Sequence, residues 1–153
     1  MSGSLGAWYS LRDLEALGAR QSGLDGELEL AGLPRLAGLL HSTAGSVRAS
    51  LQFRQRGLGA LAATLDLDTT VELTCQRCLE PFAQPIKERL ELMLVEPGAS
   101  ADSVPEGYEA VELENGRLFP AGLIEDELIV SIPLVPKHAR IEDCGSLARN
   151  LTT

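Results

Sequence analysis

Three stretches of the chain alternate apolar and polar residues with a period of two, and this pattern constrains the fold more than any other feature. The stretches are residues 46–54, 65–74 and 86–94. Because successive side chains of a strand point to opposite faces of a sheet, each stretch predicts a strand with one buried and one solvent-facing side. Such strands are typical of antiparallel sheets, and Val111 and Leu113, which lie among glutamates, predict a fourth strand.

Helical patterns flank these strands. A helix is expected from Leu11, with Ser10 as its N-cap, because leucines recur there at intervals of three residues. Proline suits the first turn of a helix, and Pro34 and Pro120 each open a further apolar segment. The segment after Pro120 should end near Ser131, because two more prolines follow closely.

Together these elements predict an α+β fold. We expect one domain over residues 1–145, built on an antiparallel sheet of four to six strands that could curve toward a barrel. A short alternation at residues 27–30 would supply one of these strands. One hairpin would carry a CxxC motif, and two or three helices would pack on one face of the sheet. Residues 146–153 show no clear pattern and are expected to fray.

The chain is acidic, and the excess of acidic residues is concentrated in its second half. Its 22 acidic and 13 basic side chains give a net charge of −9. Residues 96–153 hold eleven of the acidic side chains but only four of the basic ones. Such a field repels a polyanion, so a basic protein is a better-matched partner than naked RNA. The acidity could equally serve solubility alone.

The sequence also bears on the compartment of the protein. It has no run of about 18 apolar residues, so no membrane span is expected. Its first residues lack a basic stretch followed by an apolar run, which argues against a secretory signal. Three cysteines make an odd number that does not suit a closed disulfide framework. We therefore expect reduced thiols in a cytoplasmic protein.

The three cysteines and one histidine form a candidate metal site. Cys75 and Cys78 lie between the second and third strands, so a hairpin tip could turn both sulfurs toward one ion. Zinc then needs two more ligands, and His138 and Cys144 stand close together after the proline-rich break. A site with three cysteines and a histidine would use every cysteine in the chain, which favours zinc.

Two other interpretations of the cysteines remain open. Redox-active CxxC pairs lie at a helix N-terminus, whereas Pro81 would cut short any helix that follows Cys78. Alternatively, the cysteines are plain thiols and His138 is a surface residue. His41 is interpreted as the polar end of a helix and not as a ligand.

Two groups of charged side chains are candidate contacts for a partner. The basic group, a candidate RNA contact, consists of Arg48, Arg54, Arg56 and Arg77. The acidic group, on the third expected helix, consists of Glu125, Asp126 and Glu127. Either group could instead be an ordinary solvated surface. A glycine-rich phosphate loop and a Ser–His–Asp arrangement are both lacking in the sequence, so we expect binding and not catalysis.

Two sequence blocks resemble the YceD family, the large ribosomal RNA subunit accumulation proteins. The first is VELTCQRCLEPF at residues 71–82, and the second is IEDELIVSIPLVPKH at residues 124–138, followed by Cys144. The order and spacing of the blocks fit the family from about residue 20 to residue 145. The resemblance implies a role in the synthesis, processing or accumulation of large-subunit ribosomal RNA, without a known enzymatic activity.

The resulting hypothesis is a ribosome-assembly factor that engages a nascent large ribosomal subunit, through a basic ribosomal protein or through ribosomal RNA. Zinc at the four Cys and His side chains would hold the hairpin, with Arg77 and residues 125–127 near the working surface. No membrane and no small-molecule substrate is expected as a partner. The alternatives are a module that binds RNA directly and a CxxC thiol oxidoreductase.

Overall fold

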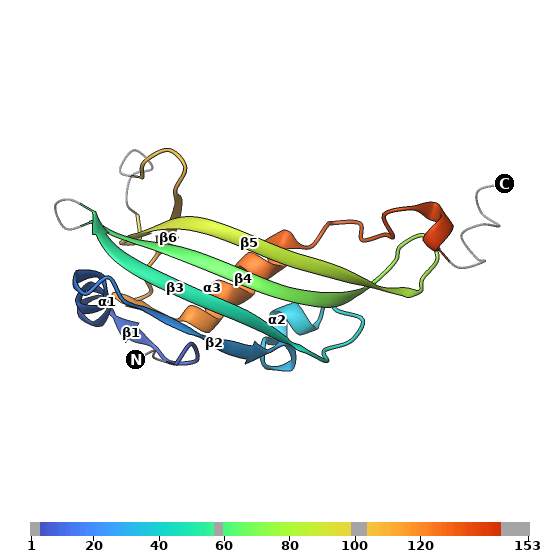
Figure 1. The fold of residues 1–153 in the computed structure, drawn as a ribbon, viewed down its shortest axis with the longest axis horizontal. Helices are drawn as coiled ribbons and strands as arrows, with labels where there is room; N and C mark the ends of the chain where they lie inside the picture. Colours follow the sequence, from blue (N-terminus) through green and yellow to red (C-terminus); the bar gives the residue numbers. More distant parts are fainter. Residues whose placement is uncertain (1–3, 57–59, 99–103, 145–153) are drawn as a thin grey trace.

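The structure, a computed structural model, describes residues 4–56, 60–98 and 104–144 and is built around one twisted five-stranded sheet (Figure 1). The strand order is β2-β3-β4-β5-β6. These strands are β2 (Gly23–Glu29), β3 (Ser46–Arg56), β4 (Ala60–Thr74), β5 (Pro81–Val95) and β6 (Glu109–Glu112). A small second sheet pairs β1 (Tyr9–Ser10) with β7 (Arg117–Leu118). The helices are α1 (Leu11–Ala19), α2 (Pro34–Ala37) and α3 (Pro120–Ser131), with 3-10 turns η1 (Leu30–Gly32) and η3 (Ile141–Asp143).

The three alternating stretches form β3, β4 and β5, as predicted. These strands pair antiparallel in chain order, and the register places Leu51 opposite Leu65 and Ala63 opposite Leu92. All four of these side chains are buried. The period-two pattern therefore builds one continuous apolar face across the three strands.

The last strand corrects the expectation of a wholly antiparallel sheet. β6 pairs with β5 in parallel, from Leu92 opposite Glu109 to Val95 opposite Glu112. A parallel neighbour needs a crossover of about a dozen residues, and the chain between β5 and β6 is long enough to provide one. Because β2 and β6 are opposite edges of the sheet, the described strands do not close into a barrel.

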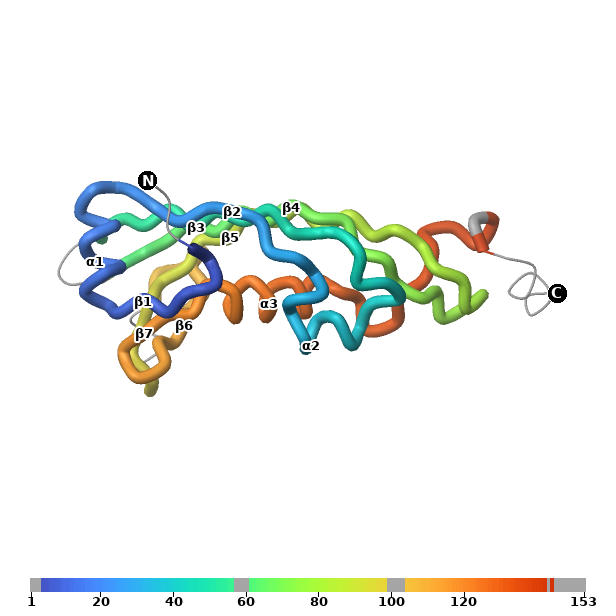
Figure 2. Tube along the Cα trace, turned by 90° about the horizontal axis from the view of Figure 1, so that it is seen from below, coloured from blue at the N-terminus to red at the C-terminus, as the bar shows by residue number. Residues whose placement is uncertain are grey.

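Two helices lie side by side below the sheet. Figure 2 shows α2 and α3 beneath the strands. α3 has the predicted bounds, whereas α2 is only one turn long. The chain leaves α2 to reach the edge of β4, where the His41 N–H donates to the Glu72 carbonyl.

α1 begins where the sequence predicts. Ser10 is its N-cap, and the Ser10 hydroxyl and the Asp13 carboxylate each accept a backbone N–H from the other residue. The helix packs closely on the sheet at Gly18, where a Cβ atom would lie 2.7 Å from Leu61. Leu14 and Ile124 join the strand residues in one apolar cluster, so α1 and α3 both cover the buried face.

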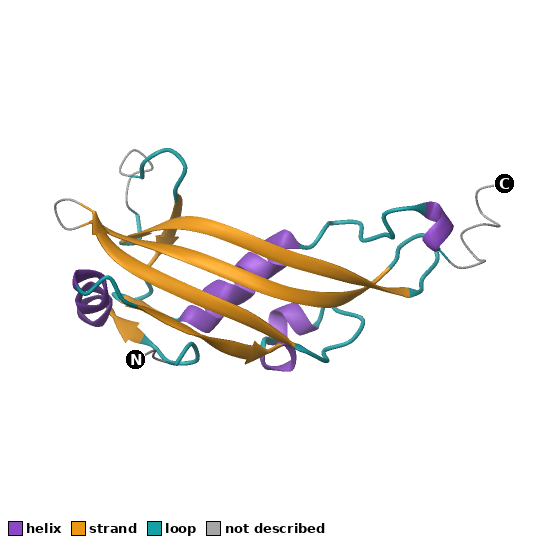
Figure 3. Ribbon diagram, in the orientation of Figure 1, coloured by secondary structure: helices purple, strands orange, loops and turns teal. Residues whose placement is uncertain are grey.

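The β4–β5 hairpin extends beyond the rest of the sheet and forms an arm. Pairing of β3 with β4 begins at Arg48 and Asp68, but β4 and β5 remain paired as far as Thr74 and Pro81. The tip of this arm lies at the end of the molecule opposite α1 (Figure 1). After α3, a loop continues in the same direction to the tip of the arm and ends in η3 (Figure 3).

Candidate metal centre

The tip of the arm is a tight turn that buries two sulfurs. The Cys75 N–H donates to the Glu80 carbonyl at 2.9 Å, and the Leu79 N–H donates to the Cys75 carbonyl at 2.8 Å. Leu79 takes a left-handed conformation with φ of +63°, which costs a non-glycine residue about 1 kcal/mol or more. The turn leaves Cys75 and Cys78 almost fully buried, although both lie at the extremity of the fold.

The segment after α3 docks on this turn and supplies the remaining donors. The Gln76 N–H donates to the Pro136 carbonyl at 2.8 Å, and the Arg77 guanidinium donates to the His138 carbonyl at 2.6 Å. These bonds bring His138 and Cys144 against the two cysteines of the turn. As predicted, residues 60 or more positions apart in sequence come together at one point.

Four donor atoms then surround a common centre. The Cys75 and Cys144 sulfurs are 3.8 Å apart, and the His138 Nδ1 lies 3.6 Å from the Cys78 sulfur and 3.5 Å from the Cys144 sulfur. All four donor atoms lie within 4.8 Å of one another, so the group could hold a metal ion. The sulfurs are free thiols, well beyond the distance of about 2.05 Å in a disulfide.

The environment of Cys75 stabilises a thiolate. Burial alone would raise its pKa, but the backbone N–H groups of Cys78, His138 and Arg77 lower the pKa of the Cys75 thiol to about 5. Two of these donors lie close to the sulfur, the Arg77 N–H at 3.4 Å and the His138 N–H at 3.5 Å. These contacts favour the thiolate form of Cys75, which is the form that binds a metal.

Cys144 has the opposite tendency. Burial, together with hydrogen bonding to Cys75 and Cys78, raises the pKa of the Cys144 thiol to about 11. Without a cation the cluster keeps its charge low, because adjacent thiolates repel each other. A metal held by all four side chains must therefore displace at least one proton, and its binding weakens as the pH falls.

Two residues support the donors from outside. The Phe82 ring packs 5.0 Å from the His138 ring, centroid to centroid, and helps to orient the imidazole. The sequence did not single out Phe82. Arg77 was predicted to lie on a contact surface, but its guanidinium ties the two segments together, and within the described part of the chain its buried Nε has no hydrogen-bond partner.

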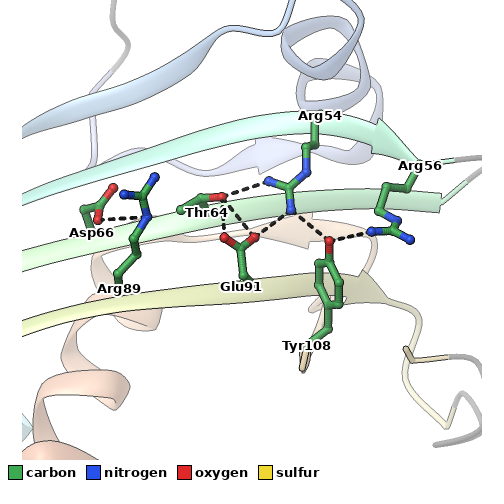
Figure 4. A network of polar contacts seen from close by, with 7 residues as sticks. All are labelled: Arg54, Arg56, Thr64, Asp66, Arg89, Glu91 and Tyr108. Atoms are coloured by element: carbon green, nitrogen blue, oxygen red, sulfur yellow. Dashed lines mark hydrogen bonds and ion pairs between the residues drawn. The ribbon is translucent and has the colours of Figure 1, made fainter. Parts of the chain in front are cut away.

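The predicted basic group does not form one patch. Arg48 pairs with Glu27 at 2.9 Å on the solvent-facing side of the sheet. Arg54 pairs with Glu91 at 2.6 Å and shares the Tyr108 hydroxyl with Arg56 (Figure 4). Arg77 lies apart from these arginines, at the tip of the arm. The three strand arginines are therefore already engaged by acidic or phenolic side chains.

Charges alternate across this solvent-facing side. In register, Glu27 faces Arg48, Arg48 faces Asp68, and Asp68 faces Lys87. A second pair joins Arg89 to Asp66 at 3.7 Å (Figure 4). Opposite charges on neighbouring strands stabilise a sheet. The alternation gives this face a balanced charge instead of a basic field.

The predicted acidic group is divided by burial, which corrects the idea of one solvated surface. Glu125 is only 5% exposed. Its carboxylate accepts the N–H groups of Arg35 and Leu36 at 2.7 and 3.1 Å, and also the Arg35 guanidinium. It therefore satisfies the N-terminus of α2 from outside. Asp126 is exposed and pairs with Arg35 at 2.7 Å.

Glu127 is half-buried between α3 and the sheet. Burial and hydrogen bonding to Glu109 raise the pKa of the Glu127 carboxyl to about 8. His41 takes no part in the donor group: its Nδ1 lies 3.0 Å from the Thr74 hydroxyl, and its Nε2 lies 3.7 Å from Glu72.

Comparison with known proteins assigns the chain to a family. The model of the family described as "Large ribosomal RNA subunit accumulation protein YceD" matches residues 63–150, which is more than half of the chain. This chain belongs to the YceD family. The match includes all four donor residues and the two sequence blocks that resembled the family.

A curated YceD-family relative supports the assignment. The Large ribosomal RNA subunit accumulation protein YceD of Haemophilus influenzae is 43% identical over 70 residues. The matched region is 45% of this chain and spans 40% of the length of the relative. No solved structure matches the chain. In the described part of the chain, no helix has the length and apolar character needed to span a membrane.

Proposed function

We propose that this protein is a ribosome-biogenesis factor that supports the synthesis, processing or accumulation of large-subunit ribosomal RNA. The observation that carries the proposal is the family match, whose description names accumulation of this RNA and names no reaction. The protein would act in the cytoplasm by binding, and not by catalysis. Its partner would be the nascent large subunit or one of its basic ribosomal proteins, which suits a chain with a net charge of −9.

The metal centre is proposed to be a structural zinc site held by Cys75, Cys78, His138 and Cys144. A tetrahedral zinc separates two thiolate sulfurs by about 3.8 Å, and a sulfur from an imidazole nitrogen by about 3.5–3.6 Å. The observed separations of 3.8 Å and of 3.5–3.6 Å support this geometry. A structural zinc of this kind contributes on the order of 10 kcal/mol to folding. Four protein ligands leave no position open for a substrate.

Direct binding of RNA is a second candidate, favoured by one observation. The Arg54 and Arg56 guanidiniums lie 5.8 and 5.1 Å from the centre of the Tyr108 ring, a cationic and aromatic corner. The ion pairs of Arg48 and Arg54 weigh against it, because RNA would have to displace Glu27 and Glu91. Direct binding predicts affinity for large-subunit RNA fragments with a steep salt dependence, lost in Arg48→Glu or Arg54→Glu.

A thiol oxidoreductase is less well supported. The low pKa of Cys75 is typical of reactive thiolates. All three cysteines, however, are buried at the tip, so a dithiol substrate would have to open the turn. Unreactive thiols in the metal-loaded protein would exclude this activity.

The proposed role is tested in cells that lack the protein. The ratio of large-subunit to small-subunit ribosomal RNA should fall in these cells and should recover with the wild-type chain. The Cys75→Ser variant should restore the ratio poorly, because it removes a ligand of the proposed zinc. An unchanged ratio in the deletion strain would overturn the proposed role.

A further inference from the structure

Exposed apolar side chains are concentrated near the metal centre. Six large apolar side chains of the described residues are exposed, and Trp8 is the one that lies at the other end of the fold. The other five are Leu39, Leu79, Val130, Leu134 and Val135. Leu134 is fully exposed, and Leu39 is 51% exposed. Grouped exposed apolar side chains mark interaction surfaces more often than isolated ones do.

Two of these side chains, Leu39 and Leu134, line a groove of about 500 Å³. One wall is the end of α2 with Leu39 and Leu40, and the floor is the last turn of α3 with Ile129 and Ile132. The second wall is the loop after α3, which contributes Leu134 and Pro136. Thr74 and Gln76 of the arm close one end. The lining is thus mainly aliphatic, with a few polar groups, as in sites that accept peptide side chains.

The metal centre holds the second wall in place. Leu134 lies between the end of α3 and His138, and the Gln76 N–H fixes the neighbouring Pro136 carbonyl at 2.8 Å. The two ends of this loop are therefore anchored by α3 and by the donor residues. Release of His138 and Cys144 would free the loop and remove one wall of the groove.

Charges around the groove indicate the chemistry of its occupant. The lining contains no lysine, arginine or glutamate. Glu72 shares a face of β4 with Thr74, which lines the groove, and its carboxylate is about half exposed, 3.7 Å from His41. Asp126 on α3 is already paired with Arg35 at 2.7 Å. The carboxylate of Glu72 thus borders an apolar centre, in a chain whose net charge is −9. Neither RNA nor an anionic membrane complements such a surface.

We propose that this groove docks an apolar segment of a basic large-subunit protein, with leucine-like side chains in the groove and a lysine or arginine facing Glu72. This inference rests on the proposed role in ribosome biogenesis and names the class of partner. It also makes docking dependent on the metal, because the metal centre builds one wall. The groove accordingly has two states, assembled and disassembled, that metal loading controls.

The test uses the full metal-loaded chain and purified large-subunit ribosomal proteins, presented one at a time. Leu134→Glu places a charge in the groove at a position too exposed to affect folding. Gln55→Glu adds the same charge at an exposed position near α1 and is the matched control. At least one basic protein should bind the wild type and the control with equal affinity. Its affinity for Leu134→Glu and for the metal-free chain should be at least about tenfold lower.

Several results would overturn the inference. They are undiminished binding by Leu134→Glu, absence of binding to every protein in the set, and a dimer of this chain that Leu134→Glu dissociates. Binding of RNA fragments or of anionic vesicles that Leu134→Glu abolishes would do the same. An experiment in cells distinguishes failure of the docking proposal from failure of the proposed role in ribosome biogenesis. Full rescue of the ribosomal RNA ratio by Leu134→Glu would overturn the groove alone, whereas no rescue by the wild type would overturn the role.

Discussion

At the scale of single residues, the four donor side chains illustrate how a small protein can order its extremity. Cys75 and Cys78 lie at the tip of the arm, outside the main apolar cluster, and form a small cluster of their own with Cys144. Apart from the cysteines themselves, Phe82 is the apolar residue packed there. Apolar burial is therefore small at this point, and a bound metal would supply the missing stabilisation.

Replacing one ligand should lower metal content and stability together. We expect Cys75→Ser to lose the metal and to cost at least about 3 kcal/mol, or about 10 °C in melting temperature for a chain of this size. Thermal unfolding followed by circular dichroism, with elemental analysis of the same sample, measures both. A variant that loses the metal but melts with the wild type would show that the site has no structural role.

Glu125 is the second residue with a large expected effect. Truncation in Glu125→Ala leaves the N–H groups of Arg35 and Leu36 and part of the Arg35 guanidinium unpaired, which should cost about 3 kcal/mol. Asp126→Ala removes the exposed partner of the same arginine and should cost less than about 1 kcal/mol. Equal urea midpoints for the two variants would contradict this account.

The effect of Glu125 should also depend on pH. Burial alone would raise the pKa of its carboxyl, but bonds from Leu36 and Arg35 more than offset this and lower it below the ordinary value. A carboxyl whose pKa is lower in the folded protein stabilises the fold at pH values above its unfolded pKa. This contribution is lost as the pH falls through the folded pKa. The difference between wild type and Glu125→Ala should therefore be full at pH 7 and should shrink in acid.

At the scale of elements, local sequence patterns predicted where helices and strands lie better than how these elements pair. The strands β3, β4 and β5, the capped start of α1 and both ends of α3 follow from periodicity, Ser10 and proline positions, all of which act within a few residues. The parallel direction of β6 and the short α2 could not be predicted in this way. Both depend on contacts with distant strands, such as the bond from His41 to Glu72.

The same limit applies to the candidate site. The meeting of Cys75, Cys78, His138 and Cys144 could be predicted, because few residue types in the chain can complete a metal site. The burial of Glu125 and the pairing of Arg54 with Glu91 could not. Charged residues show no periodic signal that distinguishes a solvated side chain from one neutralised by a distant partner.

Packing of α3 on the sheet places four carboxylates near one another, with a measurable consequence. The raised pKa of Glu127 reflects burial first, and then Glu109 on β6 and the charges of Asp126 and Glu88. Because the pKa of Glu127 is higher in the folded protein than in the unfolded chain, this carboxyl does not reduce the free energy of unfolding below about pH 4.5. It reduces that free energy as the pH rises from there toward about 8.

Glu127→Gln should therefore stabilise the protein in alkaline solution only. We expect a gain on the order of 1 kcal/mol at pH 9, after allowance for the solvent that reaches this half-exposed group, and no gain at pH 4.5. Melting temperatures of both proteins at the two pH values measure the difference. An equal effect at both pH values would mean that ionisation of Glu127 is not the cause.

At the scale of the whole molecule, the two ends and two faces of the fold differ in character. The solvent-facing side of the sheet is polar, with charges that alternate between strands. The end that carries the metal centre has most of the exposed large apolar side chains of the described residues. The sheet provides a rigid support, and the arm and the docked loop present the surface that we assign to a basic protein partner.

The central claim is that a metal joins the arm to the segment after α3. The most direct test is elemental analysis of the purified protein together with a count of reactive thiols under native conditions. The account predicts about one zinc per chain and three thiols that stay unreactive until the metal is chelated. A metal-free protein with three freely reactive thiols would contradict the claim, and the groove beside the arm would then lose the contact that holds its wall.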